Sequence, residues 1–125
     1  MLRSALGKEV ITKVGDVFFI EMTHWHQGNY VMANHVVEYE LNRRLGWEPV
    51  LKAASRSEDQ ADIGDRAEHR WTYELTPVDS GSTMVTETYD CSRAPEWLRK
   101  AVKGGTRWLD SMTATLEMLD ALTLD

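Results

Sequence analysis

Residues 94–125 read APEWLRKAVKGGTRWLDSMTATLEMLDALTLD and form the only long stretch of the chain with an unbroken helical hydrophobic period. Charged side chains such as Arg99 and Glu117 fall on the opposite side of this period. The pattern predicts one long amphipathic helix that lies on the rest of the protein. Its apolar stripe, with Trp108 at the edge, contains Leu98, Ala101, Val102, Gly105, Leu109, Met112, Leu116 and Leu119.

Local signals favour a helix that starts near Pro95 and is interrupted near its middle. Pro95 suits the first turn, where a missing N–H costs nothing, and Glu96 complements the positive end of the helix dipole. Gly104 and Gly105 each cost a helix roughly 1 kcal/mol relative to alanine. The pair therefore predicts a kink or a close approach of another part of the chain.

The composition is that of one globular domain. A chain of 125 residues with 42% hydrophobic and 27% charged side chains can bury a single core. Fourteen basic and twenty acidic residues give a formal charge of -6, which argues against binding to nucleic acid or to an anionic membrane. No apolar run is long enough to span a bilayer, and the first ten residues lack the apolar core of a signal peptide. We therefore expect a cytoplasmic protein without membrane insertion.

Residues with metal-binding or nucleophilic chemistry are few. Cys91 is the one cysteine, and nothing beside it in the sequence marks an activated nucleophile, so a buried structural thiol is the favoured interpretation. His24 and His26 would share one face of a strand, but no third ligand stands at a suitable spacing. The sequence therefore predicts neither a metal site nor a cofactor.

Six short segments have the hydrophobic alternation and the flanking turns of β-strands. Tight turns such as Gly15-Asp16 and Asn42-Arg43 join neighbouring segments, which predicts an antiparallel meander. The predicted strands cover residues 8–14, 17–26, 30–41, 44–51, 67–77 and 83–91. With the closing helix they predict an α+β fold, in which a curved six-stranded antiparallel sheet grips one long C-terminal helix.

A polar stretch, residues 52–66, separates the fourth and fifth predicted strands. Ser55 and Glu58 have the spacing of a capping box, and Gly64 stands where a short helix would end, so we expect a turn or two of helix here. In a meander, alternate connections share one end of the sheet. This stretch, the turn at 27–29 and the junction at 91–95 should therefore meet at the mouth of any pocket.

Three passages in the chain carry a family resemblance. They are residues 37–47 (VEYELNRRLGW), the pair 70–77 (RWTYELTP) and 81–86 (GSTMVT), and Thr115-Leu116 with Leu119. These resemble, in order, a strand with an Arg-containing turn and a Trp-bearing strand, a penultimate hairpin and the end of a closing helix in the START-like helix-grip superfamily. The similarity is to its polyketide cyclase/dehydrase and lipid-transport branch, the SRPBCC proteins. It implies a single helix-grip domain over residues 1–125, with room for an apolar molecule between sheet and helix.

The resemblance also implies a start that is short in this sequence. Members of the superfamily begin with a strand and a pair of short helices that cradle the closing helix, and few residues precede Lys8. Without that strand, residues 83–91 would be a bare sheet edge, and the closing helix would keep part of its apolar stripe uncovered. We therefore expect a homodimer in which a second copy covers these surfaces.

Residues on the helix-facing side of the strands would line the cavity. In the register we assume for the first hairpin, Glu21 lies near His35, and Glu87 lies near Tyr73 or Trp71 on the later strands. An apolar pocket with a few convergent polar groups is typical of a small-molecule site. The predicted ligand-binding residues are Phe19, Trp25, His35, Val37, Tyr39, Trp47, His69, Trp71, Tyr73, Glu87, Tyr89, Leu109 and Met112.

The sequence leaves three functions open. The leading hypothesis is binding of a small hydrophobic molecule, a lipid or a polyketide-like aromatic, in that cavity. The second is a cyclase or dehydratase that uses His35, His69, Glu21 or Glu87 as acid or base. The third is a dimeric interaction module whose pocket is filled by its own side chains. A fold resemblance alone does not decide among them.

Overall fold

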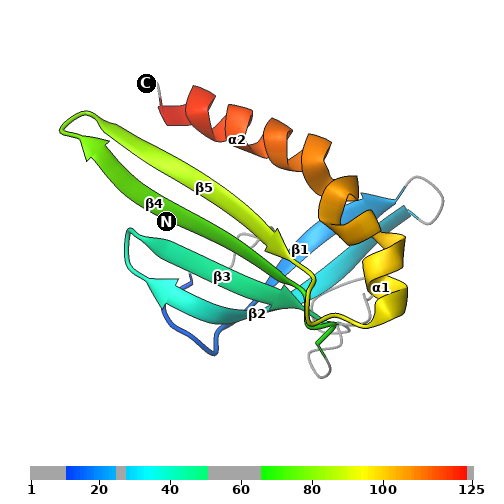
Figure 1. Cartoon of the computed structure of the whole chain (residues 1–125). Coiled ribbons are helices and arrows are strands. Elements are labelled where there is room, and N and C mark those ends of the chain that lie inside the picture. The colour runs from blue at the N-terminus through cyan, green and yellow to red at the C-terminus, as the bar shows by residue number, and fades with distance from the viewer. Residues whose placement is uncertain (1–10, 25–27, 51–65, 124–125) are drawn as a thin grey trace.

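The structure is a computed structural model, and it describes residues 11–24, 28–50 and 66–123. Five strands form one antiparallel sheet in the order β1-β2-β3-β4-β5, and a helical C-terminal segment follows (Figure 1). The strands are β1 (Val17–His24), β2 (Gly28–Glu40), β3 (Arg44–Pro49), β4 (Arg70–Asp79) and β5 (Ser82–Asp90). The helices are α1 (Glu96–Ala101), the 3-10 helix η2 (Lys103–Trp108) and α2 (Leu109–Thr123).

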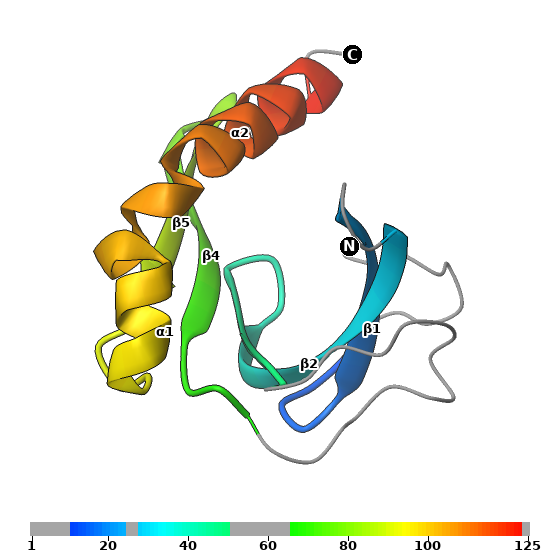
Figure 2. The same cartoon turned by 90° about the vertical axis from the view of Figure 1, so that its right-hand side faces the viewer.

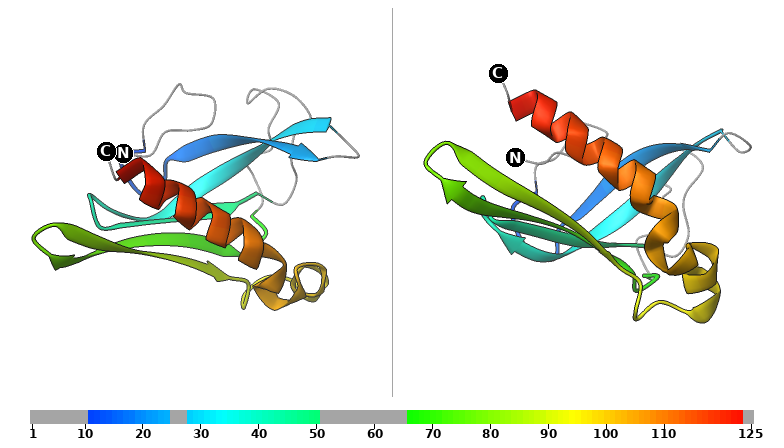
Figure 3. Two further views of the ribbon diagram at one scale, coloured as in Figure 1. Left: turned by 90° about the horizontal axis from the view of Figure 1, so that it is seen from above. Right: turned by 45° about the horizontal axis from the view of Figure 1, so that its top comes forward.

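The final helix covers one part of the sheet. After α1, the chain turns so that α2 runs back along β5, at one edge of the sheet (Figures 1 and 3). Figure 2 shows α2 on the same side of the molecule as β4 and β5, with the β1–β2 hairpin standing apart from it. The helix therefore lies over the β4–β5 half of the sheet.

The prediction of six strands is wrong, because the described part of the first predicted segment is a turn. The Asp16 carboxylate accepts hydrogen bonds from the backbone N–H groups of Thr12 and Lys13, at 2.9 and 3.2 Å. The same carboxylate accepts a hydrogen bond from the Thr12 hydroxyl, at 3.1 Å. Backbone donors that a strand would offer to a neighbour are thus used locally, as is usual for aspartate in turns.

The other five predicted strands are confirmed, with ends that move by at most three residues. Their antiparallel meander is also as predicted. The turn or two of helix that we expected within residues 52–66 lies outside the described residues, apart from Arg66, which forms an isolated bridge with Val50.

A β-bulge in β2 decides which side chains of the first hairpin enter the core. Val36 pairs with Trp47, but the next pair is Glu38 with Gly46, so Val37 is an extra residue in β2. Before the bulge, the even-numbered residues of β2 share a face with Trp47; after it, the odd-numbered ones do. The main core cluster accordingly contains Ile11, Phe18, Val36 and Trp47, with Ile20, Tyr39, Leu45, Trp71 and Tyr73 packed against it.

The bulge overturns the register that we assumed for the first hairpin. Phe18 packs edge-on against Trp47, with ring centroids 5.6 Å apart, so its neighbour Phe19 lies on the opposite face of β1. His35 pairs with Glu48 of β3 and likewise lies on the opposite face. Pairing by simple alternation fails here because one extra residue reverses the two faces of a strand.

The closing segment is three helices and not the single one that was predicted. Gly104 and Gly105 have φ angles of +66° and +100°, in the left-handed region, and they break the helix between α1 and α2. A Cβ on Gly105 would lie 3.0 Å from Cδ2 of Tyr89, so β5 approaches the backbone closely at this point. Both consequences that we expected of the glycine pair, the kink and the close approach, are therefore confirmed.

The kink changes which side chains of the final helix face the sheet. Trp108 is half-buried and faces inward, whereas Leu109 is 57% exposed, so the prediction that Leu109 faces the sheet is wrong. Downstream, the half-buried side chains of α2 are Met112, Leu116 and Leu119, and none of the described side chains of α2 up to residue 121 is fully buried. The helix thus keeps an apolar stripe that protein atoms only partly cover.

A second, smaller core cluster fixes the start of the helical segment. Cys91, Ala94 and Val102 are buried there, and Tyr89, Leu98 and Trp108 pack against them. The Cys91 thiol is free and buried, as the structural interpretation of this residue predicted.

Replacing Gly105 by alanine should destabilise the protein more than the same change at Gly104. Both residues have positive φ, which costs alanine about 1 kcal/mol, but only the new methyl group at position 105 would meet the Tyr89 ring. We expect losses of about 1 kcal/mol for Gly104→Ala and about 2–3 kcal/mol for Gly105→Ala in urea unfolding followed by circular dichroism. Equal losses would show that the Tyr89 contact has no energetic role.

Candidate functional site

Four side chains of β4 and β5 form one block on the face of the sheet toward the helices. Trp71 pairs with Tyr89, and Tyr73 pairs with Glu87. The rings of Trp71 and Tyr89 have centroids 4.6 Å apart and are tilted by 51°. Trp108 covers this pair from η2, with its ring centroid 5.8 Å from that of Trp71 and 6.2 Å from that of Tyr89. The result is an aromatic layer between the sheet and the helical segment.

His69 joins this layer from the residue before β4. Its Nδ1 lies 2.6 Å from the Tyr89 hydroxyl oxygen, a hydrogen bond, and the two rings meet edge to face. Burial lowers the pKa of His69 below its usual 6.5, and the charge of Glu48 opposes this shift. The imidazole is therefore neutral at neutral pH, and depending on its tautomer it either donates a hydrogen bond to the Tyr89 hydroxyl or accepts one from it.

Glu87 is the carboxylate of this layer. Its Oε1 is buried and has no hydrogen-bond partner among the residues that the structure describes. Burial raises the pKa of Glu87 above 4.5, and the nearby Tyr73 hydroxyl, a hydrogen-bond donor, opposes the shift. Burial also raises the pKa of Tyr73, first of all, and the Glu87 charge adds to that effect. Glu87 thus carries an unused acceptor inside an apolar environment.

Trp108 contributes an unused donor to the same layer. Its indole Nε1 is buried and forms no hydrogen bond of ordinary geometry within the described part of the chain. Burial raises the pKa of Tyr89, and the Trp108 indole opposes the shift, so the N–H acts on the Tyr89 hydroxyl from nearby. Buried polar groups in proteins are nearly always hydrogen-bonded, and an exception is a candidate for contact with a bound molecule.

Most of the residues that we predicted to line a ligand site lie on this side of the sheet. Trp47 stacks against Tyr73, with ring centroids 5.6 Å apart and an angle of 21° between the rings. Trp47 itself is only 8% exposed, so it supports the layer from below and offers little surface to a ligand. The predicted residues that the fold brings to this side are Tyr39, Trp47, His69, Trp71, Tyr73, Glu87, Tyr89 and Met112.

Other predicted residues do not join them. Phe19 and His35 are on the opposite face of the sheet, Val37 is the extra residue of the bulge, and Leu109 is exposed. His35 pairs with Val17 across the hairpin, and Glu21 pairs with Val31, so the expected proximity of Glu21 and His35 is wrong. The prediction for Trp25 lies outside the described residues.

The sequence indicates that Trp108 packs between helix and sheet, which the structure confirms, but Trp108 was not among the predicted ligand-binding residues, and the core residue Phe18 was assigned to the wrong face of β1. Trp108 was placed at the edge of the helical stripe, because an unbroken period across Gly104 and Gly105 sets the wrong phase for the helix that follows. Treating the two glycines as a break would have moved Trp108 inward. Phe18 of β1 was assigned to the wrong face because the bulge in the paired strand β2 reverses the faces, and no residue type in β2 predicts that bulge.

The opposite face of the sheet has a different chemistry. Arg70 donates hydrogen bonds to Glu48 at 2.8 and 3.0 Å and to Glu38 at 2.7 Å. Arg44 pairs with both Glu38 and Glu74. The hydrogen bond from Arg44, together with that from Arg70, holds the pKa of Glu38 below 4.5. Carboxylates and guanidinium groups thus alternate across β2, β3 and β4.

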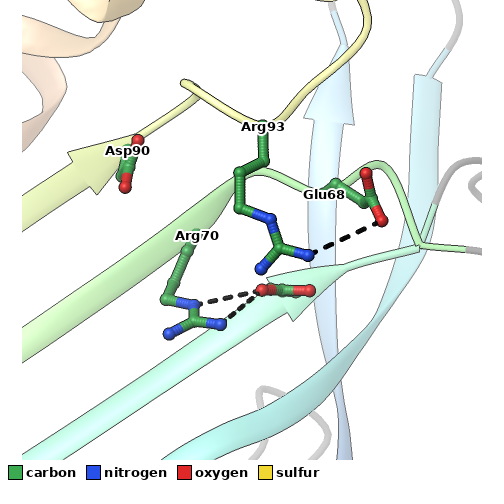
Figure 4. A pocket seen from close by; sticks show the side chains of 5 residues that line it. Glu68, Arg70, Asp90 and Arg93 are labelled. Carbon is green, nitrogen blue, oxygen red and sulfur yellow. Dashed lines mark hydrogen bonds and ion pairs between the residues drawn. The ribbon is translucent and has the colours of Figure 1, made fainter.

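A small charged hollow lies at one end of this opposite face. It is lined by Glu48, Glu68, Arg70, Asp90 and Arg93. Arg70 forms an ion pair with Glu48, and Figure 4 shows the ion pair of Arg93 with Glu68. Its volume is about 90 Å³. Sites for small organic ligands usually enclose several hundred Å³ and are mostly apolar, so this hollow does not have the form of a ligand site.

Within the described ranges, no three His, Cys, Asp or Glu side chains converge as the ligands of a metal ion would. None of the described helices combines the length and the apolar character needed to cross a membrane.

The architecture, an open antiparallel sheet followed by a C-terminal helical segment over one part of it, is that of a START-like helix-grip domain. Over residues 4–117 the chain matches the family described as Activator of Hsp90 ATPase homolog 1-like protein. The chain therefore belongs to that family, which is part of the superfamily that the sequence resembled. No curated protein and no solved structure matches the chain.

Neutralising Glu87 should stabilise the protein, and the gain should depend on pH. Because the folded-state pKa is raised, ionisation of Glu87 opposes folding as pH rises above about 4.5, and this penalty is complete above the folded-state pKa. Tyr73, which faces it, stays protonated throughout. We expect Glu87→Gln to raise Tm at pH 7.5 and to lose this advantage at pH 4.0 in thermal unfolding.

Glu38 provides the control of opposite sign. Its pKa is lowered in the folded protein, so its charge stabilises above pH 4.5, and this contribution is lost as pH falls through the folded-state pKa. Glu38→Gln should cost about 1–3 kcal/mol at pH 7.5, since it weakens charge-assisted hydrogen bonds from two arginines. If both glutamine variants were less stable than the natural chain at pH 7.5, the account of Glu87 would be wrong.

Proposed function

We propose that this protein binds a small, largely apolar molecule with one polar end, on the surface between the β4–β5 hairpin and α2. One observation carries the proposal: an unpartnered acceptor, Glu87 Oε1, and a donor that forms no hydrogen bond of ordinary geometry, Trp108 Nε1, belong to the same aromatic layer. A polar group of a ligand placed there would satisfy both atoms. Each unsatisfied buried group costs about 1–3 kcal/mol, so binding would recover free energy that the unliganded protein lacks.

The apolar stripe of α2 supports the same proposal. Met112, Leu116 and Leu119 are only half-buried although they point toward the sheet side of the helix. An apolar chain lying along them would bury surface that the protein alone leaves in contact with water. The family to which the chain belongs has a fold suited to hydrophobic ligands. A lipid or a polyketide-like aromatic has the required form.

The proposal predicts that a neutral apolar fluorophore binds and that Met112 contributes to its affinity. We would titrate the protein with N-phenyl-1-naphthylamine and follow the rise in its fluorescence. Met112→Asp should weaken binding about tenfold, since it replaces an apolar contact worth roughly 1–2 kcal/mol by a charge. Met118→Asp is the matched control on the same helix, because Met118 is 66% exposed and should leave affinity unchanged.

Two results would contradict the proposal. If the natural chain gave no saturable change in fluorescence, the protein would have no apolar site that binds the fluorophore. Equal loss of affinity in the Met112 and Met118 variants would show that the fluorophore responds to added charge or to unfolding, and far-ultraviolet circular dichroism separates those two explanations.

A second candidate is acid–base catalysis of the cyclase or dehydratase kind, and the His69–Tyr89 hydrogen bond favours it. A neutral imidazole bonded to a tyrosine hydroxyl can withdraw a proton from carbon beside a carbonyl group. The protein should then accelerate hydrogen–deuterium exchange at the α-carbon of an enolisable aromatic ketone such as 1-tetralone, measured by NMR. His69→Gln should abolish the acceleration without changing Tm by more than a few degrees. An unaffected rate would exclude His69 as the base.

A third candidate is an interaction module, either a homodimer or a partner of another protein. The observation in its favour is the exposed apolar surface of α2, where Leu109 and Met118 are 57% and 66% exposed. The family description refers to activation of an Hsp90 ATPase, which is an activity exerted on another protein. Light scattering after size exclusion should give twice the chain mass if a second copy covers this surface. A monomer at 0.1 mM would exclude the homodimer.

A further inference from the structure

The acidic side chains on the two faces of the sheet differ in whether they have arginine partners. On the face away from the helices, Glu38, Glu48 and Glu74 each have an arginine partner. Arg70 bridges two of these carboxylates, and Arg44 bridges two as well. Negative charge on this face is therefore compensated within the protein.

Among the residues that the structure describes, Glu87 has no arginine or lysine partner. Burial and the Tyr73 hydroxyl are the influences that act on its ionisation, and no lysine or arginine is among them in the described part of the chain. Its Oε1 is nevertheless withdrawn from solvent. A carboxylate in this situation attracts a positive charge, and a bound molecule with a cationic group can supply one.

The aromatic rings on the same face as Glu87 are inclined to one another. Trp71 and Tyr89 are inclined by 51°, Trp71 and Trp108 by 63°, and Tyr89 and Trp108 by 68°. Rings set at such angles present faces in different directions, and a cation near them is attracted by the negative charge of each face. All three rings are half-buried, so part of each remains accessible. Tyr73, which pairs directly with Glu87, adds a fourth ring.

We propose that the polar end of the ligand is a primary or secondary alkylammonium group, held by the Glu87 carboxylate and by the rings of Trp71, Tyr89 and Trp108. This inference rests on the proposed function, since it names the chemical class of the molecule bound at the same site. An N–H of the ammonium would satisfy Glu87 Oε1, and its charge would compensate the carboxylate. A neighbouring hydroxyl or carbonyl oxygen of the ligand would accept the hydrogen bond that Trp108 Nε1 has available.

The test compares three probes with the same ten-carbon chain: decylamine, 1-decanol and decanoate. Each is used below its micelle-forming concentration, at pH 7.5, to displace N-phenyl-1-naphthylamine from the protein. We expect decylamine to displace the fluorophore at a concentration at least about tenfold lower than 1-decanol, and decanoate to be the weakest of the three. Glu87→Gln should reduce the affinity for decylamine about tenfold and leave that for 1-decanol within about twofold.

Glu74→Gln is the matched control. Glu74 neighbours Tyr73 on β4, but it pairs with Arg44 on the opposite face of the sheet. This change removes the same single negative charge from the protein without touching the aromatic layer. The Glu74 variant should keep the full preference for decylamine.

Each other outcome has a definite meaning. If the three probes displace the fluorophore equally well, the apolar site stands and the ammonium assignment is overturned. If the preference for decylamine survives in Glu87→Gln, or falls equally in Glu74→Gln, it comes from the overall charge of -6 and the assignment is again overturned. If the fluorophore itself does not bind, the proposed function fails before the headgroup is tested.

Discussion

The contact between Gly105 and the Tyr89 ring is the constraint on which the arrangement of this protein depends. The backbone of residue 105 reaches the ring of β5 because it has no side chain, and its φ of +100° turns the chain at the same point. The turn brings Trp108 onto Trp71 and Tyr89. Since no described side chain of α2 up to residue 121 is fully buried, this junction, more than packing along the helix, determines where α2 lies.

The two faces of the sheet differ in chemistry: one carries ion pairs, and the other carries the aromatic rings of the proposed binding surface. Away from the helices, Arg70 and Arg44 link carboxylates of three strands, and Gly46 leaves room for Glu38, because a Cβ there would lie 3.2 Å from the Glu38 Cβ. Toward the helices, the bulge at Val37 places both Val36 and Tyr39 on the side of β2 that packs against Trp47. The arginine–carboxylate pairs thus lie on one face of the sheet, and the packed aromatic rings lie on the other.

Glu87 and Trp108 are the exceptions to the second pattern. Their unpartnered atoms cost stability in the protein alone, and a sequence selected only for folding would replace them with apolar residues. Such exceptions concentrate where proteins bind other molecules, because polar groups that a ligand satisfies give selectivity as well as affinity. The family match establishes the fold. The side chains of this chain, and not the fold, determine the chemistry of the proposed site.

The sequence by itself determined the α+β class, the five confirmed strands, the kink at the glycine pair and the aromatic content of β4 and β5. Alternation, turn residues and glycine costs are local properties, so they can be predicted without knowing what packs against what. Only the tertiary structure decided that Phe18 and not Phe19 enters the core, and that Trp108 and not Leu109 faces the sheet. One inserted residue in β2 sets the first orientation, and the direction that the helix takes after the glycine pair sets the second. Both depend on contacts between distant segments.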